Sequence, residues 1–454
     1  MNEQVNRLLD SYQEQMAETL CRWLRVPSVK GEALSGAPFG AQVRAMLDLA
    51  MQDCAAIGLT VRDFDGYACD ATLGREDQEL IAVLAHLDVV PAGDGWLTDP
   101  FEPTRVGDRL YARGTSDDKG PAVAALYAMR AIREAGVPLR RGIRLILGCD
   151  EESGWEDMAY YSAHTAMPEL GFSPDASFPL INTEKGMLHM MLRAPAPEDG
   201  LRVKRLCTGE RINVIPGESV CVVEGDGTTV RAVEAFAART GLDVRAECTQ
   251  EGVRITATGI PGHSAYPEGR RNAIGMLLLT LRELGATGAW RTLADAVGME
   301  HDGASLGIAC ADDVSGALTC NMGILHLEGD EIVASLDCRC PITAGLEALR
   351  DTALAHLPGV TATHVEIKAP HHVPADSELV TSLLAAYTEV TGQSAAPEST
   401  GGGTYAKVLK SGVAFGSAFP DDEDLAHQAN EYVILPKLLT AAKIYANALV
   451  RLAT

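Results

Sequence analysis

The sequence has few basic residues, and that shortage limits its partners. Its 454 residues include 38 lysines and arginines against 62 aspartates and glutamates, which gives a formal net charge of −24 at pH 7. This charge disfavours nucleic acids and anionic membrane surfaces as the main ligands, because both are themselves negative. Cations are the ligands that it favours.

Long apolar runs, an export signal and paired cysteines are also missing. No stretch approaches the roughly 18 continuous apolar residues of a membrane-spanning helix. The first residues show no basic segment followed by an apolar one, so we expect a cytoplasmic protein. The 11 cysteines are scattered and never spaced C-x-x-C, which favours reduced thiols over disulfides or a structural zinc site.

Two common catalytic signatures are absent as well. The sequence has no G-x-S-x-G elbow and no G-x-G-x-x-G after a predicted strand, which disfavours serine hydrolases and dinucleotide-binding enzymes. The glycine run from Gly401 through Gly402 and Gly403 to Thr404 lacks the lysine and the spacing of a P-loop. Its backbone N–H groups are better suited to approach a carboxylate.

The pattern of apolar residues predicts an α/β protein of at least two domains. Predicted helices and short apolar strands alternate through residue 185, and the same alternation returns from residue 376 to residue 454. We expect these two segments to form one domain, with a mixed, mostly parallel sheet flanked by helices. Residues 186–375 read as strands, hairpins and a few helices, which predicts an inserted α+β domain made of two subdomains.

A short apolar run, Leu80–Leu84, predicts a buried strand that is closed by the turn formers PAGDG. His86 and Asp88 follow it two residues apart, so an extended backbone would point both side chains to one face. They fit a metal ligand and the carboxylate that orients its ring. For a single H-x-D triplet, however, a structural histidine at a strand end is the commoner explanation.

Acidic residues follow other predicted strands. Glu151 and Glu152 come directly after the buried run Arg144–Gly148, and Asp175 lies beside a further apolar run. Adjacent acids repel one another unless a cation lies among them. Because ligands of open α/β sheets collect beyond the carboxyl ends of the strands, we expect these acids to lie near His86.

Two further polar segments carry candidate ligands. Asp117 and Asp118 precede a helix predicted from Ala122 to Ala135, where an acidic pair could also cap the helix and answer its dipole. His427 lies in the loop PDDEDLAHQANEY, which no packing argument explains. Two histidines and several carboxylates suit a pair of divalent ions such as zinc, with manganese or cobalt also tolerated.

With these residues in view, the chain closely resembles a family of dinuclear zinc metallopeptidases that includes aminoacylases, carnosinases and desuccinylases. It is most similar to the bacterial dipeptidase V branch of that family. The matching stretches span nearly the whole chain in the family's order: AHLDVVPAGDGW, ARGTSDDKGP, GCDEESGW, SPDASFPLINTEKG, INVIPGE, DCRCPIT, GGGTYAK and AHQANEY.

The resemblance implies a site for two divalent ions, zinc above all, held by five side chains. His86 and Asp175 would bind one ion, Glu152 and His427 the other, and Asp117 would bridge both.

It also implies the residues that act on the substrate's scissile bond. Glu151 would be the general base toward a water bridged by the ions, and Asp88 would hold the His86 ring. The peptide bond between Asp117 and Asp118 would be cis.

The inserted domain would be a lid that contacts the substrate. His263 matches the family's donor to the oxyanion, and Asn213 and Arg339 match its substrate contacts, with Arg339 suited to a carboxylate. The run from Gly401 to Thr404 would donate to the same end of the substrate. Lys407 replaces the family's arginine, so its role is not carried over. The long insertion fits the doubled lid of the dipeptidase V branch, which implies a monomer.

The expected function is therefore a metal-dependent dipeptidase that hydrolyses dipeptides with a free N-terminal amine. An N-acyl amino acid amidohydrolase or desuccinylase on the same site is the alternative. A binding protein without catalysis is the third hypothesis, and the presence of Glu151 beside five ligands argues against it.

Overall fold

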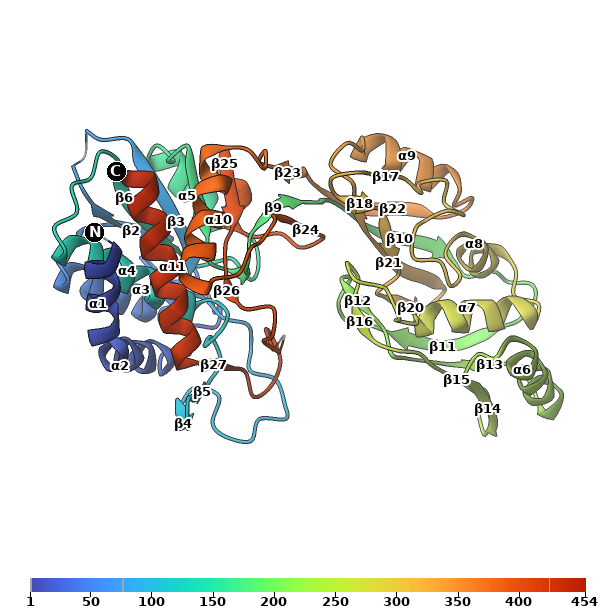
Figure 1. Ribbon diagram of the computed structural model, residues 1–454. Coiled ribbons are helices and arrows are strands. Elements are labelled where there is room, and N and C mark those ends of the chain that lie inside the picture. The colour runs from blue at the N-terminus through green and yellow to red at the C-terminus, as the bar shows by residue number, and fades with distance from the viewer. Residues whose placement is uncertain (1, 76, 424) are drawn as a thin grey trace. The chain divides into compact units, whose positions relative to one another are not determined.

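The computed structural model describes residues 2–75, 77–423 and 425–454 and divides the chain into two compact units (Figure 1). Unit 1 contains the residues up to Asn182 together with His372–Glu398 and Gly403–Thr454. Unit 2 contains Thr183–His371 and Ser399–Gly402. Within the described residues, no helix is both long and apolar enough to cross a membrane.

The sheet of unit 1 has the strand order β1-β2-β6-β3-β7-β25-β9-β23, with β24 paired to β9; the chain passes between the two units within β9, β23 and β24. Neighbours are parallel from β6 through β3 and β7 to β25 and antiparallel at β1/β2, β2/β6 and β25/β9. The predicted α/β class is thus confirmed, with the parallel pairing at the centre of the sheet. These strands are β1 (Thr60–Phe64), β2 (Ala68–Leu73), β3 (Leu80–His86), β6 (Gly142–Gly148), β7 (Leu170–Ser173), β9 (Ile181–Glu184), β23 (His371–His372), β24 (Glu398–Thr400) and β25 (Ser411–Ala414).

Helices cover both faces of this sheet because its central strands are apolar on both sides. Ile81 and Val83 of β3 face the large core beneath α4 and α11, whereas Ala82 and Leu84 face a smaller core with α5 and the 3₁₀ turn η1. Helices α1, α4 and α11 pack against one another over the first face (Figure 1). The helical elements are α1 (Asn2–Ser11), α2 (Gln13–Leu24), α3 (Ala41–Ala56), α4 (Lys119–Glu134), α5 (Glu156–His164), α10 (Glu378–Thr391), η1 (Tyr405–Val408) and α11 (Leu435–Ala453).

The parallel strands bring the predicted polar residues to one edge of the sheet. His86 is the last residue of β3 and pairs in register with Gly148, the last residue of β6. The acids that follow β6 and β7 therefore emerge beside His86. Short strands complete unit 1: β4 (Thr104–Val106), β5 (Arg109–Tyr111), β8 (Ala176–Ser177), β26 (Ser417–Ala418) and β27 (Tyr432–Ile434).

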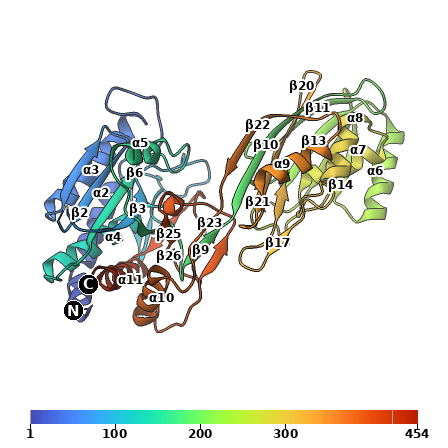
Figure 2. The ribbon, with the colours of Figure 1, turned by 90° about the horizontal axis from the view of Figure 1, so that it is seen from above.

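Unit 2 contains a long sheet in the order β14-β15-β13-β11-β20-β21-β10-β22, with β19 also paired to β21. Strands β10, β21 and β22 run side by side (Figure 2). The strands are β10 (Gly186–Pro195), β11 (Val203–Thr208), β13 (Glu218–Val223), β14 (Val244–Thr249), β15 (Gly252–Thr258), β19 (Thr319–Asn321), β20 (Leu325–Glu328), β21 (Glu331–Cys340) and β22 (Thr361–Lys368), with the short pairs β12 (Val214–Ile215)/β16 (Gly262–His263) and β17 (Ala311–Asp312)/β18 (Gly316–Ala317).

One face of the unit 2 sheet is apolar and the other is polar. Alternate residues such as Leu188 and Leu336 belong to the core with α7 and α8, while their neighbours His189, Asp337 and Arg339 lie on the opposite face. The helices are α6 (Gly227–Thr240), α7 (Ala273–Glu283), α8 (Gly288–Ala296) and α9 (Leu346–Ala355).

The predicted hairpin of unit 2 differs from the structure in one strand. Leu318–Leu327 reads as one continuous strand in the sequence, but it is divided into β19 and β20. Between them lies Gly323, where an added Cβ would come within 2.4 Å of the Ile212 carbonyl oxygen. The close approach of the segment that precedes β12 explains both the glycine and the interruption.

Candidate metal centre

His86 is the last residue of β3, and its side chain is fully buried with one ring nitrogen facing the acidic residues. Its Nδ1 lies 2.9 Å from the backbone oxygen of Asp88, and its Nε2 lies 2.9 Å from Oδ1 of Asp117 and 3.8 Å from Oδ2 of Asp175. A carbonyl oxygen only accepts, so Nδ1 carries the proton of the neutral ring. Nε2 is then the nitrogen that faces the acids, in the tautomer that metal-binding histidines use.

His427 reaches the same acids from the loop before β27. Its backbone has a positive φ of 64°. Its Nε2 lies 3.0 Å from Oδ2 of Asp117 and 2.9 Å from Oε2 of Glu152. The two oxygens of Asp117 thus face one histidine each, which is the geometry that a bridging carboxylate needs. The Asp117–Asp118 peptide bond is cis, as the resemblance implies. The Asp118 carboxylate accepts a hydrogen bond from the backbone N–H of His86 at 3.1 Å.

The potential ligand atoms form two overlapping groups. His86, Glu151 and Asp175 form one, and His86, Asp117 and Glu152 form the other; within each group the ligand atoms all lie within 4.8 Å of one another. Within the part of the chain that the structure describes, these are the groups of three or more such residues that could hold an ion. His427 belongs to neither group, but its Nε2 lies beside Asp117 and Glu152, so every predicted metal ligand is brought to one place, together with Glu151.

The charges of this cluster are poorly balanced without a cation. Burial, together with the charge of Asp117, raises the pKa of Asp175 to about 7. Burial and the charge of Asp175 raise the pKa of Glu151 well above its usual value, and burial with Asp117 raises that of Glu152. A divalent ion would remove this repulsion, and imidazole with carboxylate is a donor set that zinc accepts. The residues therefore fit a metal.

Asp117 and the two histidines show the complementary effect. Burial disfavours the charged form of Asp117, but hydrogen bonds from His427 and His86 outweigh it and lower its pKa. Burial also opposes protonation of His427, yet its contacts with Asp117 and Glu152 raise its pKa to about 10. Burial likewise opposes protonation of His86, but its contacts with Asp117 and Asp88 raise its pKa well above the usual value. Metal binding to these two rings therefore has to displace protons.

Asp88 holds more than the His86 ring. Its carboxylate lies 3.4 Å from Nδ1 of His86, and its two oxygens accept the backbone N–H groups of Glu151 at 3.2 Å and Glu152 at 3.1 Å. One buried side chain thus links the end of β3 to the segment after β6. The sequence suggests the contact to His86 but not the two backbone contacts.

Glu431 is a buried residue of this site that sequence reasoning missed. Its carboxylate accepts hydrogen bonds from one loop, which contains Asp117 and precedes α4. The donors are Nη1 of Arg113 (2.6 Å), N of Gly114 (3.1 Å), Oγ1 of Thr115 (3.3 Å), N and Oγ of Ser116 (2.8 and 3.0 Å) and N of Asp117 (3.3 Å). Glu431 therefore fastens the Asp117 loop to the loop that carries His427, and a lone acid four residues after His427 is its only sequence signal.

Asp157 of α5 supports the segment before Glu151 in a similar way. Its carboxylate accepts the N–H groups of Cys149 at 2.6 Å and Asp150 at 3.0 Å and the hydroxyl of Tyr405. Burial raises its pKa to about 6 in spite of these hydrogen bonds. Tyr405 follows the glycine run directly, and its hydrogen bond to Asp157 helps to hold the segment before Glu151.

In unit 2, two of the predicted substrate contacts lie next to each other. His263 pairs with Val214 in the short β12/β16 ladder. The backbone N–H of Ser264 donates to the backbone oxygen of Asn213 at 3.0 Å. The N–H of Ala265 donates to Nδ1 of His263 at 3.1 Å. Nε2 therefore carries the proton of the neutral His263 ring and can act as a donor.

Arg339 of β21 is nearly buried in a polar network on the long sheet of unit 2. Its Nη1 donates to the Gly401 oxygen at 2.8 Å and its Nη2 to Asp337 at 3.0 Å, so each nitrogen keeps a second N–H. Its Nε lies 2.9 Å from Asp337 without the alignment of a hydrogen bond. Asp337 also accepts the Ser264 hydroxyl at 2.5 Å.

The glycine run crosses the boundary between the units. Gly401 and Gly402 belong to unit 2, whereas Gly403 and Thr404 belong to unit 1. A Cβ on Gly401 would lie 2.7 Å from the Cβ of Ala265, which explains this glycine by packing within unit 2. The structure does not test the predicted binding roles of these four residues.

Comparisons with known proteins agree with the geometry. The model of Peptidase family M20/M25/M40 matches residues 82–451. "Putative dipeptidase YtjP" of Bacillus subtilis is 36% identical over 450 residues, which cover 95% of this chain and 96% of that protein. SAB1611c of Staphylococcus aureus, which has the same designation, is 32% identical over 458 residues and 97% of both chains.

Solved structures share the fold. Human carnosine dipeptidase 1 matches with a TM-score of 0.61 at 15% identity, covering 99% of this chain and 98% of that chain. The dipeptidase Dug1p of Saccharomyces cerevisiae matches with a TM-score of 0.61 at 14% identity and the same coverage. Since the family model spans most of the sequence and the cluster at the strand ends has the donors of a metallopeptidase, the chain belongs to Peptidase family M20/M25/M40.

Proposed function

We propose that the protein is a metal-dependent dipeptidase. The observation that carries this proposal is the cluster of two histidines and four carboxylates at the carboxyl ends of β3, β6 and β7. Peptidase family membership and the dipeptidase designations of its relatives support a peptide bond as the target. An N-acyl amino acid amidohydrolase on the same site has no observation in its favour.

Two divalent ions, with zinc favoured over manganese or cobalt, are the cofactors of this proposal. His86 and Asp175 would hold one ion, Glu152 and His427 the other, and Asp117 both. When bound, such ions act as Lewis acids and lower the pKa of a water molecule enough to make it a nucleophile near neutral pH.

Glu151 is the proposed general base. Its carboxylate lies in the same group as His86 and Asp175, so in the ionised form it can accept a proton from the attacking water and pass it to the leaving amine. The N–H of Glu151 is held by Asp88, which keeps the carboxylate at the edge of the metal cluster. Asp88 therefore acts through the residues that it positions.

Unit 2 would serve as the substrate-binding lid of a monomeric, cytoplasmic enzyme. His263 would donate its Nε2 proton to the oxyanion, with Asn213 beside it. The second N–H groups of Arg339 and the run from Gly401 to Thr404 would bind the substrate's carboxylate. A clamp on the terminal carboxylate limits the substrate at its C-terminal end, which favours dipeptides.

The test is a panel of free dipeptides, tripeptides and N-acylated amino acids, assayed with zinc, manganese or cobalt. We expect turnover of dipeptides alone, its loss after dialysis against a chelator and its recovery when a divalent ion is restored. Turnover that is indifferent to the chelator would contradict the metal-dependent mechanism. Turnover of N-acylated amino acids in place of dipeptides would favour the amidohydrolase.

Glu151→Gln gives the sharper test of mechanism. We expect it to retain bound metal while turnover falls by about 10²-fold or more, because a general base contributes that much. A variant with near-normal turnover would remove Glu151 from this role.

A further inference from the structure

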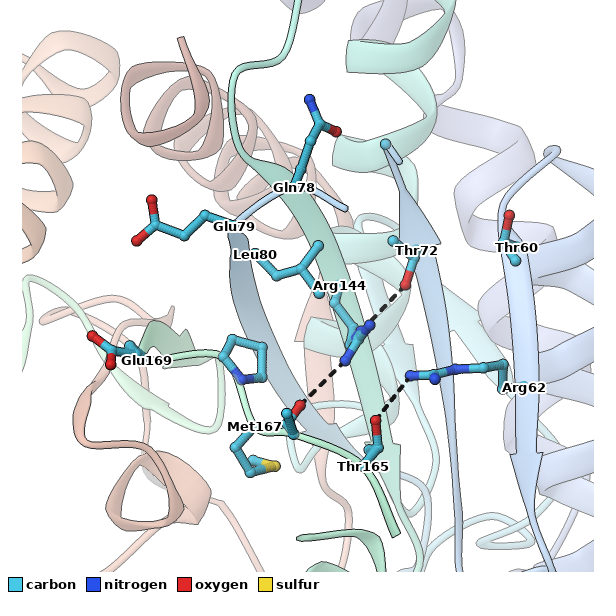
Figure 3. A pocket seen from close by; sticks show the side chains of 13 residues that line it. Thr60, Arg62, Thr72, Gln78, Glu79, Leu80, Arg144, Thr165, Met167 and Glu169 are labelled. Carbon is cyan, nitrogen blue, oxygen red and sulfur yellow. Dashed lines mark hydrogen bonds between the residues drawn. The ribbon is translucent and has the colours of Figure 1, made fainter. Parts of the chain in front are cut away.

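Unit 1 contains a cavity at the end of its central strands opposite to the metal cluster. Its volume is about 510 Å³, and it is lined by residues at the starts of strands, among them Leu80 of β3 and Arg144 of β6 (Figure 3). Strand β3 runs from Leu80 to His86. At about 3.3 Å per residue, this places the cavity roughly 20 Å from the metal cluster.

The pairing of β1, β2 and β6 gathers polar side chains on one face of the sheet at this cavity. Thr60 pairs with Thr72, Arg62 pairs with Asp70, and Thr72 pairs with Arg144. Directly paired residues share a face, and so do residues two apart on a strand. All five side chains therefore lie on the same face.

One buried carboxylate serves two guanidinium groups there. Asp70 is fully buried and accepts hydrogen bonds from Nε and Nη2 of Arg62, and from the Tyr161 hydroxyl at 2.7 Å. Nε of Arg144 lies 3.5 Å from the same carboxylate. Two positive charges against one negative charge leave a surplus positive charge at the wall of the cavity.

Arg144 is the less well satisfied of the two arginines. Only 8% of its surface is exposed, and its hydrogen bonds are long: 3.3 Å from Nε to Thr72 and 3.4 Å from Nη1 to the Ala166 oxygen. Across the described residues, Nη2 of Arg144 and Nη1 of Arg62 donate no hydrogen bond. Both nitrogens are reached by solvent in the cavity, so they can donate to an oxyanion at 2.7 to 2.9 Å, a distance typical of such charged pairs.

Two carboxylates at the rim do not neutralise this charge. Glu79 pairs with Arg141 at 3.0 Å, and Glu169 lies 3.8 Å from Lys410. Both side chains are mostly exposed, and their carboxylates point away from Arg62 and Arg144 (Figure 3).

We propose that this cavity binds a small oxyanion, a phosphate or a carboxylate, between Arg62 and Arg144. Both guanidinium groups extend toward the centre of the cavity, and the hydroxyl of Thr165 lies 3.5 Å from Nη2 of Arg62 at its edge (Figure 3). The planar guanidinium forks suit either type of anion. The proposal does not depend on the reaction at the metal cluster.

The test is calorimetric titration of the metal-loaded protein with inorganic phosphate and with acetate, at matched ionic strength in chloride. We expect saturable binding of at least one anion. Arg62→Gln should weaken it tenfold or more, because a charge and a donor fork are lost, and Arg144→Gln should do the same. Arg140→Gln removes the same charge from an exposed residue outside the cavity and should leave the affinity unchanged.

Each outcome decides the proposal. Binding of phosphate alone assigns the site to phosphate compounds, binding of acetate alone assigns it to carboxylates, and binding of both supports an oxyanion site. No saturable binding up to about 10 mM would overturn it. Binding that is unchanged by both substitutions would also overturn the proposal. Binding that is lost on chelation but unchanged in Arg62→Gln would place the anion on the metal and would overturn it too. If Arg144→Gln does not fold, the partly exposed Arg62 decides.

Discussion

Replacing Glu431 by glutamine tests whether this buried carboxylate assembles the metal centre. In the wild type, Oε1 accepts from Thr115, Ser116 and Asp117, and Oε2 accepts from Arg113 and Gly114. An amide keeps one acceptor oxygen and puts an NH₂ group in place of the other. At best, the glutamine oxygen faces the Ser116 side, and Arg113 and Gly114 lose their acceptor.

The expected cost in stability follows from that loss. Arg113 and Glu431 are 1% and 0% exposed, so the substitution leaves a buried, uncompensated guanidinium, which costs about 3–5 kcal/mol of unfolding free energy. The loops that carry Asp117 and His427 would no longer be tied together. Supporting groups of this kind are worth about 10- to 100-fold in metal affinity.

The assay pairs urea unfolding of the metal-loaded protein with a metal titration against a competing chelator. Glu423→Gln is the matched control, because it removes a charge from the same loop at an exposed position. Excess metal should restore much of the turnover of Glu431→Gln, since the substitution leaves every proposed ligand in place. An unfolding free energy within about 1 kcal/mol of wild type, with metal affinity unchanged, would refute the reasoning.

Three further substitutions test other parts of the site. Asp88→Asn should weaken metal binding about 10- to 100-fold in the same competition assay, because the new NH₂ group would face the backbone N–H of Glu151 or Glu152. An unchanged metal affinity would reject the positioning role of Asp88. His263→Ala should lower kcat by about 10²- to 10³-fold in steady-state assays, as expected for loss of an oxyanion donor, whereas a rise in KM alone would make it a binding residue. Burial would raise the pKa of Asp337, but its contacts with His189 and Arg339 outweigh burial and hold the pKa at about 2. The charge of Asp337 therefore stabilises the fold above its ordinary pKa of 3.8. This contribution is lost as the pH falls toward 2. The unfolding free energy of the wild type, measured in urea, should therefore drop by about 2 kcal/mol more than that of Asp337→Asn between pH 5 and pH 2, and parallel curves would contradict this.

The elements that a sequence predicts well are those whose pattern is local. The apolar run at Leu80 predicts β3 because a strand buried on both faces needs no partner to be recognised. Helix α4 begins at Lys119, three residues before the predicted start, with Asp118 as its N-cap and Pro121 in its first turns. Strand β2 escaped prediction because it contains Asp70, whose burial depends on Arg62 of another strand.

The residues of the candidate site could likewise be predicted only where their sequence signal is local. The acids near Glu151 could be predicted because they follow a recognisable strand, and the parallel sheet brings such strand ends together. Glu431 could not, since the donors that give it a task lie more than 300 residues earlier in the chain. The individual roles of His263, Asn213 and Arg339 remain predictions from the resemblance.

The wide separation of His86 and His427 in the sequence also limits when the candidate metal centre can form during synthesis. His86 is made 341 residues before His427, and all of unit 2 lies between them. At about 5 to 20 residues per second, the ribosome needs about 20 to 70 s to cover that distance. A nascent chain thus carries an incomplete set of the proposed ligands until the segment with His427 has been made, so the candidate metal centre can be completed only after unit 2 has been synthesised.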